Sequence, residues 1–351
     1  MRVAVFVPSL ASKGPVILAR DLVAGLKGKV DALDVYYFSE KKDLEFESPT
    51  HKISMSDAID FDKYDIFHSH GLRPDRYLFK NRHRIKGKLI STIHIHMAED
   101  LLYTYNRLAS IVIPPIWRKL LSRHDRIVTL SKHMSDYYRG LGIPASKLVH
   151  VYNSRNIQKN TSTPIPQADQ EAIAQLKSKY KVVGVSVALT GRKGVHQLVQ
   201  LLSARPDLAL VIIGHGPEEP RLKEMATKLK VDERFLLLGH RPDAHRYFPL
   251  FDVYGMTSYS EGFPLVMIEA GYHQCRVVCS DIPLFHELFS DTEVAFFQLD
   301  NTRSLSQAVD RALQSRDMNL RLHEAISTRY SVEVMTNNYL KVYNDALQSR
   351  T

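Results

Sequence analysis

The chain has 351 residues and a formal net charge of +9, with 44% hydrophobic residues and only 16 Gly and 16 Pro. This composition excludes collagen-like, disordered and low-complexity proteins, and the length favours two domains. The two cysteines, Cys275 and Cys279, are too few for a disulfide framework or a four-cysteine zinc site, which favours a reducing compartment. No apolar run approaches the roughly 20 residues of a membrane span, and the N-terminus lacks a signal-peptide core, so we expect a cytoplasmic protein.

The positive charge is concentrated in the first half of the chain. Residues 1–160 contain 26 Lys and Arg against 16 Asp and Glu, whereas residues 161–351 contain 21 against 22. This surplus indicates either a solvated basic face or peripheral contact with an anionic membrane surface or acidic glycolipid, at the inner face of the cytoplasmic membrane. Nucleic acid is disfavoured as a partner, because no groove-reading or aromatic-interleaved motif accompanies the charge.

Short apolar runs alternate with helix-length segments along the whole chain, which is typical of parallel sheets with crossover helices. In the first half the runs are residues 2–7, 33–38, 65–70, 88–94, 126–131 and 147–153. In the second half they are residues 181–189, 208–214, 234–239, 252–258, 276–280 and 293–297. The pattern predicts an α/β protein with two Rossmann-like domains and a cleft between them.

The domain boundary is expected in residues 156–172, a polar stretch with two prolines that has the composition of a linker. The N-terminal domain is then 1–155 and the C-terminal domain 173–329. Residues 330–351 have helical amphipathicity and should pack on the body of the protein. In open α/β sheets ligands lie beyond the carboxyl ends of the strands, so the residues just after each run are the candidates for a site.

The segment SEGFPLVMIEAG, residues 260–271, carries two carboxylates eight positions apart, Glu261 and Glu269. Ser260 to Gly262 can open a helix whose first backbone N–H groups suit a phosphate, and the carboxylates can accept hydrogen bonds from sugar hydroxyls. The alternative is a helix N-terminus whose acidic residue only complements the helix dipole.

EGFPLVMIE resembles the E-x7-E signature of the retaining glycosyltransferases of family 4, which have the GT-B fold of two Rossmann-like domains facing a central cleft. Similar segments follow the family order: RKG at 192–194, IIGHGPEEPRL at 212–222, FLLLGHR at 235–241 and DVYGMTS at 252–258. The resemblance covers the C-terminal domain well and the N-terminal domain more loosely. It implies that the C-terminal domain binds a nucleotide sugar and the N-terminal domain an acceptor.

The resemblance assigns roles within residues 260–271. Glu269 matches the position that holds the nucleotide ribose hydroxyls, and Glu261 matches the position that contacts the donor sugar. Gly262 and Phe263 would present backbone N–H groups toward the diphosphate or the sugar.

Two cationic residues precede this segment in the chain. Lys193 matches the family's lysine that neutralises the diphosphate; without the resemblance it would read as a solvated lysine at a helix start. The family's usual arginine, several residues before the Lys-Gly pair, is absent here, and an arginine stands directly beside the lysine instead. Arg192 is therefore the candidate for the second diphosphate contact.

The N-terminal half contributes weaker candidates. His94 matches a family histidine that lies beside the donor sugar, and a satisfied core histidine is its alternative. Gly14, after Lys13, stands where relatives often have a Gly-Gly pair near the phosphates.

The spacing of His68 with His70 and of His94 with His96 puts each pair on one strand face, but a metal site is disfavoured because further ligands at recognisable spacing are missing. The DFD of residues 60–62 is expected to be a solvated turn.

The resemblance implies an enzyme that transfers a hexosyl unit from a nucleotide diphosphate sugar, a UDP-sugar by family frequency, to a glycan or lipid-linked glycan. It implies retention and a place in lipopolysaccharide, O-antigen or capsule biosynthesis. We expect no cofactor, since the nucleotide diphosphate sugar is a co-substrate, and no metal requirement. Two alternatives stay open: a GT-B phosphorylase or epimerase relative, and a non-catalytic protein that binds a sugar nucleotide or glycolipid.

Overall fold

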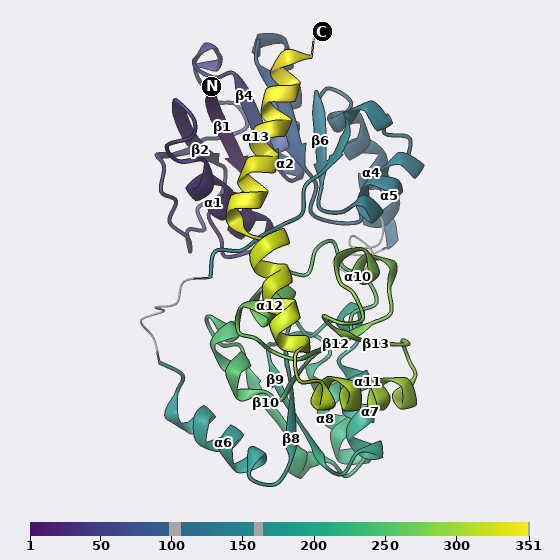
Figure 1. The fold of residues 1–351 in the computed structure, drawn as a ribbon. Coiled ribbons are helices and arrows are strands. Elements are labelled where there is room, and N and C mark those ends of the chain that lie inside the picture. The colour runs from purple at the N-terminus through teal and green to yellow at the C-terminus, as the bar shows by residue number, and fades with distance from the viewer. Residues whose placement is uncertain (98–106, 158–163, 350–351) are drawn as a thin grey trace. The chain divides into compact units, whose positions relative to one another are not determined.

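The computed structural model describes residues 1–97, 107–157 and 164–349 (Figure 1). It divides into two compact units. The N-terminal unit is Met1–Asn156 with Tyr330–Thr351, and the C-terminal unit is Ile157–Arg329. Each unit is built on its own parallel sheet.

The N-terminal unit contains a seven-stranded sheet in the order β3-β2-β1-β4-β5-β6-β7, and every pairing is parallel. Strand β1, in the interior of the sheet, is buried from Val3 to Val7, because helices cover both faces of such a sheet. The strands are β1 (Arg2–Val7), β2 (Ala32–Tyr37), β3 (Thr50–Lys52), β4 (Ile66–His70), β5 (Lys88–Thr92), β6 (Arg126–Thr129) and β7 (Leu148–His150). The helices are α1 (Gly14–Leu26), α2 (Leu72–Asn81), α4 (Arg107–Leu121), α5 (Lys132–Gly140) and α13 (Val332–Gln348).

The last helix, α13, packs on the first sheet, although it lies at the C-terminal end of the chain (Figure 1, yellow). Two buried hydrogen bonds fix it there. The Tyr343 hydroxyl lies 2.7 Å from His68 Nδ1 on β4, and the Tyr339 hydroxyl lies 3.1 Å from Thr92 Oγ1 on β5. The C-terminal helix therefore belongs to the N-terminal unit.

The C-terminal unit contains a six-stranded parallel sheet in the order β10-β9-β8-β11-β12-β13, the strand order of a Rossmann domain. Its strands are β8 (Lys181–Ser186), β9 (Leu208–Ile213), β10 (Phe235–Gly239), β11 (Val253–Met256), β12 (Val277–Ser280) and β13 (Ala295–Phe297). Its helices are α6 (Gln167–Lys177), α7 (His196–Ala204), α8 (Glu219–Lys228), α9 (Leu265–Tyr272), α10 (Pro283–Leu288), α11 (Thr302–Gln314) and α12 (Met318–Arg329). The unit has its own core between the sheet and helices α7, α8 and α11.

The predicted fold class is confirmed, and each of the twelve apolar runs overlaps a strand. The expectation of a linker over 156–172 is wrong at its end, because α6 begins at Gln167. Pro166 precedes this helix and Asp169 lies in its first turn, where a carboxylate complements the helix dipole. Residues 158–163 of the expected linker lie outside the described residues. Within the described ranges, no helix has both the length and the apolar composition to cross a membrane.

Candidate active site

Three charged side chains come together at the carboxyl end of the second sheet. Arg192 and Lys193 lie on a short 3₁₀ turn, η4 (Gly191–Lys193), after strand β8. Glu261 lies in the loop between β11 and α9, and β11 is the direct neighbour of β8. Gly194 closes the turn at φ 62°, and a Cβ there would lie 2.2 Å from the carbonyl oxygen of Thr257. Only glycine allows the two loops to approach this closely.

The carboxylate of Glu261 is held by both cations. Lys193 Nζ donates to Glu261 Oε1 at 2.5 Å, and Arg192 Nη1 lies 3.6 Å from Glu261 Oε2. Arg192 Nη1 also donates to the carbonyl oxygen of Ser260 at 2.6 Å. Two further bonds join the loops through the backbone: Thr257 Oγ1 donates to Lys193 O, and Tyr259 N donates to Arg192 O, each at 2.9 Å. We refer to Arg192, Lys193 and Glu261 as the charged cluster.

The charged cluster carries one more positive than negative charge in a mostly buried position. The Glu261 side chain is 6% exposed, and those of Lys193 and Arg192 are 16% and 19% exposed. Burial by itself would raise the pKa of the Glu261 carboxyl, but the charges of Lys193 and Arg192 and the hydrogen bond from Lys193 outweigh it and lower this pKa. Glu261 is therefore ionised at neutral pH, and the remaining positive charge suits an anionic ligand.

Glu269 lies on α9, eight residues after Glu261, and is partly exposed. Burial raises the pKa of the Tyr254 hydroxyl on β11, and the charges of Glu269 and Glu261 raise it further. Both carboxylates thus act on the same buried hydroxyl.

The expectation that Ser260 to Gly262 open a helix is wrong, because α9 begins only at Leu265. A residue before proline is disfavoured in helical conformation, so Phe263, which precedes Pro264, stays in the loop, and Pro264 is the N-cap residue of α9. The N–H of Leu265 donates to the carbonyl oxygen of Phe263 at 3.1 Å. Gly262 and Phe263 are buried in the loop that leads into α9.

His94 follows β5 in the N-terminal unit and is partly exposed. Its Nε2 lies 3.0 Å from Nδ1 of His70, which is buried at the end of the neighbouring strand β4. Burial lowers the pKa of His94 to about 3 and holds that of His70 well below its ordinary value. Both rings are therefore neutral at pH 7, and one donates the hydrogen bond that the other accepts. The pairing of His70 with His94 was not predicted from the sequence, although the place of His70 at a strand end was a usable signal.

The second expected histidine pair does not share a strand face. The rings of His68 and His70 lie 4.3 Å apart on β4. In contrast, β5 ends at Thr92, so His94 and His96 follow the strand, and His96 packs against the ring of Tyr137. Among residues 1–97, 107–157 and 164–349, no group of three His, Cys, Asp or Glu side chains has the arrangement of a metal site.

Gly14 is the first residue of α1 and is exposed, and Lys13 before it is the N-cap residue. A Cβ at Gly14 would meet no atom within 4 Å. The turn that contains Lys13 and Gly14 lies between β1 and α1, and the space beside Gly14 is open. Gly14 and His94 belong to the N-terminal unit, whereas the charged cluster and Glu269 belong to the C-terminal unit.

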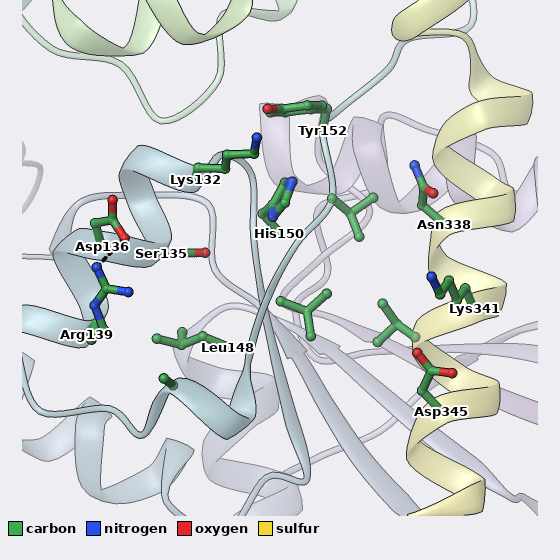
Figure 2. Close-up of a pocket in the computed structure, with 14 residues that line it drawn as sticks. Lys132, Ser135, Asp136, Arg139, Leu148, His150, Tyr152, Asn338, Lys341 and Asp345 are labelled. Carbon is green, nitrogen blue, oxygen red and sulfur yellow. Dashed lines mark ion pairs between the residues drawn. The ribbon is translucent and has the colours of Figure 1, made fainter.

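A groove of about 720 Å³ lies beside the edge strand β7 in the N-terminal unit (Figure 2). Figure 2 shows side chains of α5 on one wall and of α13 on the other, with His150 and Tyr152 between them. Asp136 and Arg139 form an ion pair of 2.8 Å on the α5 wall. The described residues that line this groove include none of the site residues expected from the sequence.

The two units, each a parallel sheet covered by helices, have the Rossmann-like architecture of the GT-B fold. Residues 166–329 match the model of the glycosyl transferases group 1, and residues 16–159 match that of glycosyltransferase family 4. The chain therefore belongs to the group 1, or family 4, glycosyltransferases, as the E-x7-E resemblance predicts, and it is a transferase enzyme.

Two curated relatives cover most of the chain. An O-antigen biosynthesis glycosyltransferase WclY of Escherichia coli is 28% identical over 98% of both chains. A 4-alpha-N-acetylgalactosaminyltransferase of Campylobacter jejuni, named for a diphospho-undecaprenol-linked acceptor, is 26% identical over 71% of this chain and 66% of its own.

Solved structures share the fold. Anabaena HepE in complex with UDP and glucose superposes with a TM-score of 0.79 at 16% identity, over 98% of this chain and 100% of its own. The apo form of the lipopolysaccharide outer core galactosyltransferase WaaB superposes with a TM-score of 0.72 at 15% identity, over the same shares. At these sequence identities the structural similarity supports the fold alone. The ligands of this chain have to be inferred from its own residues.

The charged cluster generates a prediction about acid stability. Because the folded protein lowers the pKa of Glu261, the stability that this carboxylate contributes is present above the unfolded value of about 4.3 and is lost as the pH falls through the folded value. Glu261→Gln should lower the free energy of unfolding at pH 7 by about 3 kcal/mol, since it leaves two partly buried cations without a counter-charge. The difference from the wild type should shrink in acid.

Thermal melts of the wild type and Glu261→Gln from neutral to acid pH measure this difference. Glu324→Gln, which changes an exposed carboxylate on α12, is the control and should melt like the wild type throughout. A gap between wild type and Glu261→Gln that stays constant with pH would show that the cluster does not lower the pKa of Glu261.

The His70–His94 pair generates a second prediction. With its pKa lowered to about 3, His94 should stay neutral on titration from about pH 8 to pH 5, a range in which an ordinary histidine becomes charged. Ring-proton NMR, with His94→Gln used to assign the signal, measures this directly. An inflection near pH 6.5 for His94 would contradict the account.

Proposed function

We propose that this glycosyltransferase moves a hexosyl unit from a nucleotide diphosphate sugar, with UDP as the nucleotide, to a hydroxyl of a lipid-linked glycan. The charged cluster at the carboxyl ends of β8 and β11 is the observation that carries the proposal, because it offers surplus positive charge where Rossmann sheets bind ligands. The family and the UDP complex of a structural neighbour support it.

In this proposal Lys193 and Arg192 bind the diphosphate of the donor. A lysine has three N–H donors and an arginine five, so both can take phosphate oxygens while they keep their bonds to Glu261 and Ser260. Glu261 balances only one of the two positive charges before the donor arrives. The diphosphate supplies the missing negative charge, which favours its binding over that of a neutral sugar.

The remaining donor contacts follow the 260–271 segment. Glu269 on α9 accepts hydrogen bonds from the ribose hydroxyls, and Glu261 accepts from the donor sugar. The backbone N–H groups of Gly262 and Phe263 face the diphosphate or the sugar. In the N-terminal unit, neutral His94 hydrogen-bonds the donor sugar, and Gly14 leaves its backbone open to a phosphate.

We propose a transfer with retention by displacement on one face of the sugar. The bond from the anomeric carbon to the leaving diphosphate oxygen breaks, and the acceptor oxygen bonds to the same face. The acceptor proton moves to the leaving diphosphate, while Lys193 stabilises the negative charge that develops there. Because side-chain cations supply this charge stabilisation, the proposal includes neither a metal nor another cofactor.

The names of the relatives support a bacterial surface glycan as the product. They belong to an O-antigen glycosyltransferase, to a transferase named for a diphospho-undecaprenol-linked acceptor and, among the structures, to a lipopolysaccharide core galactosyltransferase. We therefore propose a phosphorylated, lipid-linked acceptor at the inner face of a bacterial membrane. The positive surplus of residues 1–160 suits such an acceptor.

Product analysis tests the proposal. The protein is incubated with UDP-galactose, UDP-glucose or UDP-N-acetylglucosamine and with polyprenyl-diphosphate-linked glycan from bacterial membranes. We expect free UDP and a lengthened lipid-linked glycan whose new linkage keeps the α configuration of the donor, as judged by proton NMR. Lys193→Ala should reduce the turnover rate by about 100- to 1,000-fold, as loss of a charge-stabilising donor does. Glu269→Ala should mainly raise the KM for the donor.

Lys228→Ala, an exposed lysine change on α8, is the matched control and should keep full activity. Release of a sugar 1-phosphate would indicate phosphorolysis in place of transfer. A β-linked product would contradict retention, and equal activity of Lys193→Ala and Lys228→Ala would contradict the role of the charged cluster.

A further inference from the structure

Helix α4 of the N-terminal unit exposes a row of large apolar side chains. Leu108 is 70% exposed, Ile111 62%, Val112 45% and Ile116 52%. Their spacing of three, one and four residues puts them on one face of the helix. Within the described residues, the other large apolar side chains with such exposure are single ones on α12 and α13. The α4 face is therefore a contiguous apolar surface.

The opposite face of α4 is apolar as well, and it is the face that holds the helix on the protein. Trp117, Leu120 and Leu121 are buried there. Trp117 Nε1 donates to the buried carboxylate of Asp75 on α2 at 2.6 Å. Since packing on this side fixes the helix, the exposed row needs a separate explanation.

A hollow of about 700 Å³ continues the exposed face at the end of α4. Among the described residues that line it, apolar side chains form the walls, and those that carry a charge are cationic. The apolar lining residues are Pro115, Leu121, Ile127, Ile143 and Pro144, and the cationic ones are Arg118, Lys119 and Lys147. An apolar wall beside cations suits an amphiphile with an anionic head group.

Hydrogen bonds hold two of these cations in place. Arg118 Nη1 donates to Leu141 O at 2.8 Å, and Lys147 Nζ donates to Ser122 O at 2.8 Å and to His124 O at 2.9 Å. Residues 107–124 contain four Arg and Lys and no Asp or Glu. Hydrogen bonds thus hold positive charge beside the apolar face, and residues 107–124 supply no carboxylate to neutralise it.

We propose that the exposed face of α4, together with this hollow, is the surface by which the enzyme binds an anionic phospholipid bilayer. Leu108, Ile111, Val112 and Ile116 insert among the lipid chains, and the cations of the hollow bind lipid phosphates. The helix has 15 residues, about 22 Å, and is too short to span a hydrocarbon core of about 30 Å, so it lies in the plane of the membrane surface.

A second copy of this chain fits the same surface less well. Two α4 faces packed against each other would bring together the like charges of Arg118 and Lys119, and the segment has no carboxylate to pair with them. An anionic bilayer supplies the opposite charge together with an apolar interior. This inference concerns the membrane alone and does not depend on the identity of the donor or on the proposed transfer reaction.

Sedimentation of the full-length protein with lipid vesicles tests the proposal. We expect binding to vesicles of equal parts phosphatidylglycerol and phosphatidylcholine, and little binding to phosphatidylcholine alone. Higher salt should weaken the binding without abolishing it, because screening leaves the apolar insertion intact. Ile111→Ser with Ile116→Ser, and separately Lys119→Glu, should each lower the partition coefficient by about tenfold.

Leu320→Ser on α12 is the matched control, because Leu320 is 52% exposed, as is Ile116. It should bind vesicles like the wild type, and circular dichroism should show that all variants stay folded. Vesicle binding that the α4 variants leave unchanged would overturn the proposal. A second result would also overturn it: the wild type binds no vesicles but is a dimer in analytical ultracentrifugation, and the double variant Ile111→Ser with Ile116→Ser is a monomer. UDP binding in solution, unchanged in the α4 variants, separates this test from that of the proposed function.

Discussion

The ion pairs of the buried Glu261 carboxylate are the interaction on which the candidate active site depends. They join the turn after β8 to the loop after β11, two segments that are 68 residues apart in sequence. The carboxylate is costly to bury alone, and the two cations repel each other, so each charge stabilises the others in their present position. The same arrangement leaves one positive charge in excess. The same three side chains thus hold the two loops together and attract an anionic ligand.

Parallel sheet topology brings these groups together. In each unit the strands all point one way, so the loops that follow them meet at one edge. The charged cluster follows the adjacent strands β8 and β11, and the His70–His94 pair lies at the carboxyl ends of the adjacent strands β4 and β5. In the first unit α13 adds a second constraint, because its buried tyrosines bond to His68 and Thr92 beneath the histidine pair. The end of the chain thereby supports the candidate residues of the N-terminal unit.

Much of the fold was accessible from the sequence, because buried parallel strands are continuous apolar runs. Strand β3 was missed, since Thr-His-Lys at 50–52 carries no such run. The start of α9 was misplaced because Pro264 restrains Phe263, an effect stronger than the helix-opening tendency of Ser260. Within the site, the E-x7-E spacing indicated Glu261 and Glu269, and the adjacent cations indicated Arg192 and Lys193. The pairing of His70 with His94 depends on the alignment of two strands, which no local motif contains.

The most direct test of the central claim is a calorimetric titration of the wild type and Lys193→Ala with UDP, UMP and uridine. If the charged cluster binds the donor diphosphate, the substitution should weaken UDP binding by about tenfold to a hundredfold, the size expected for a lost charged hydrogen bond. The loss should be smaller for UMP and absent for uridine, which has no phosphate. An equal loss for all three ligands, or none for UDP, would contradict the assignment of this cluster as the diphosphate site.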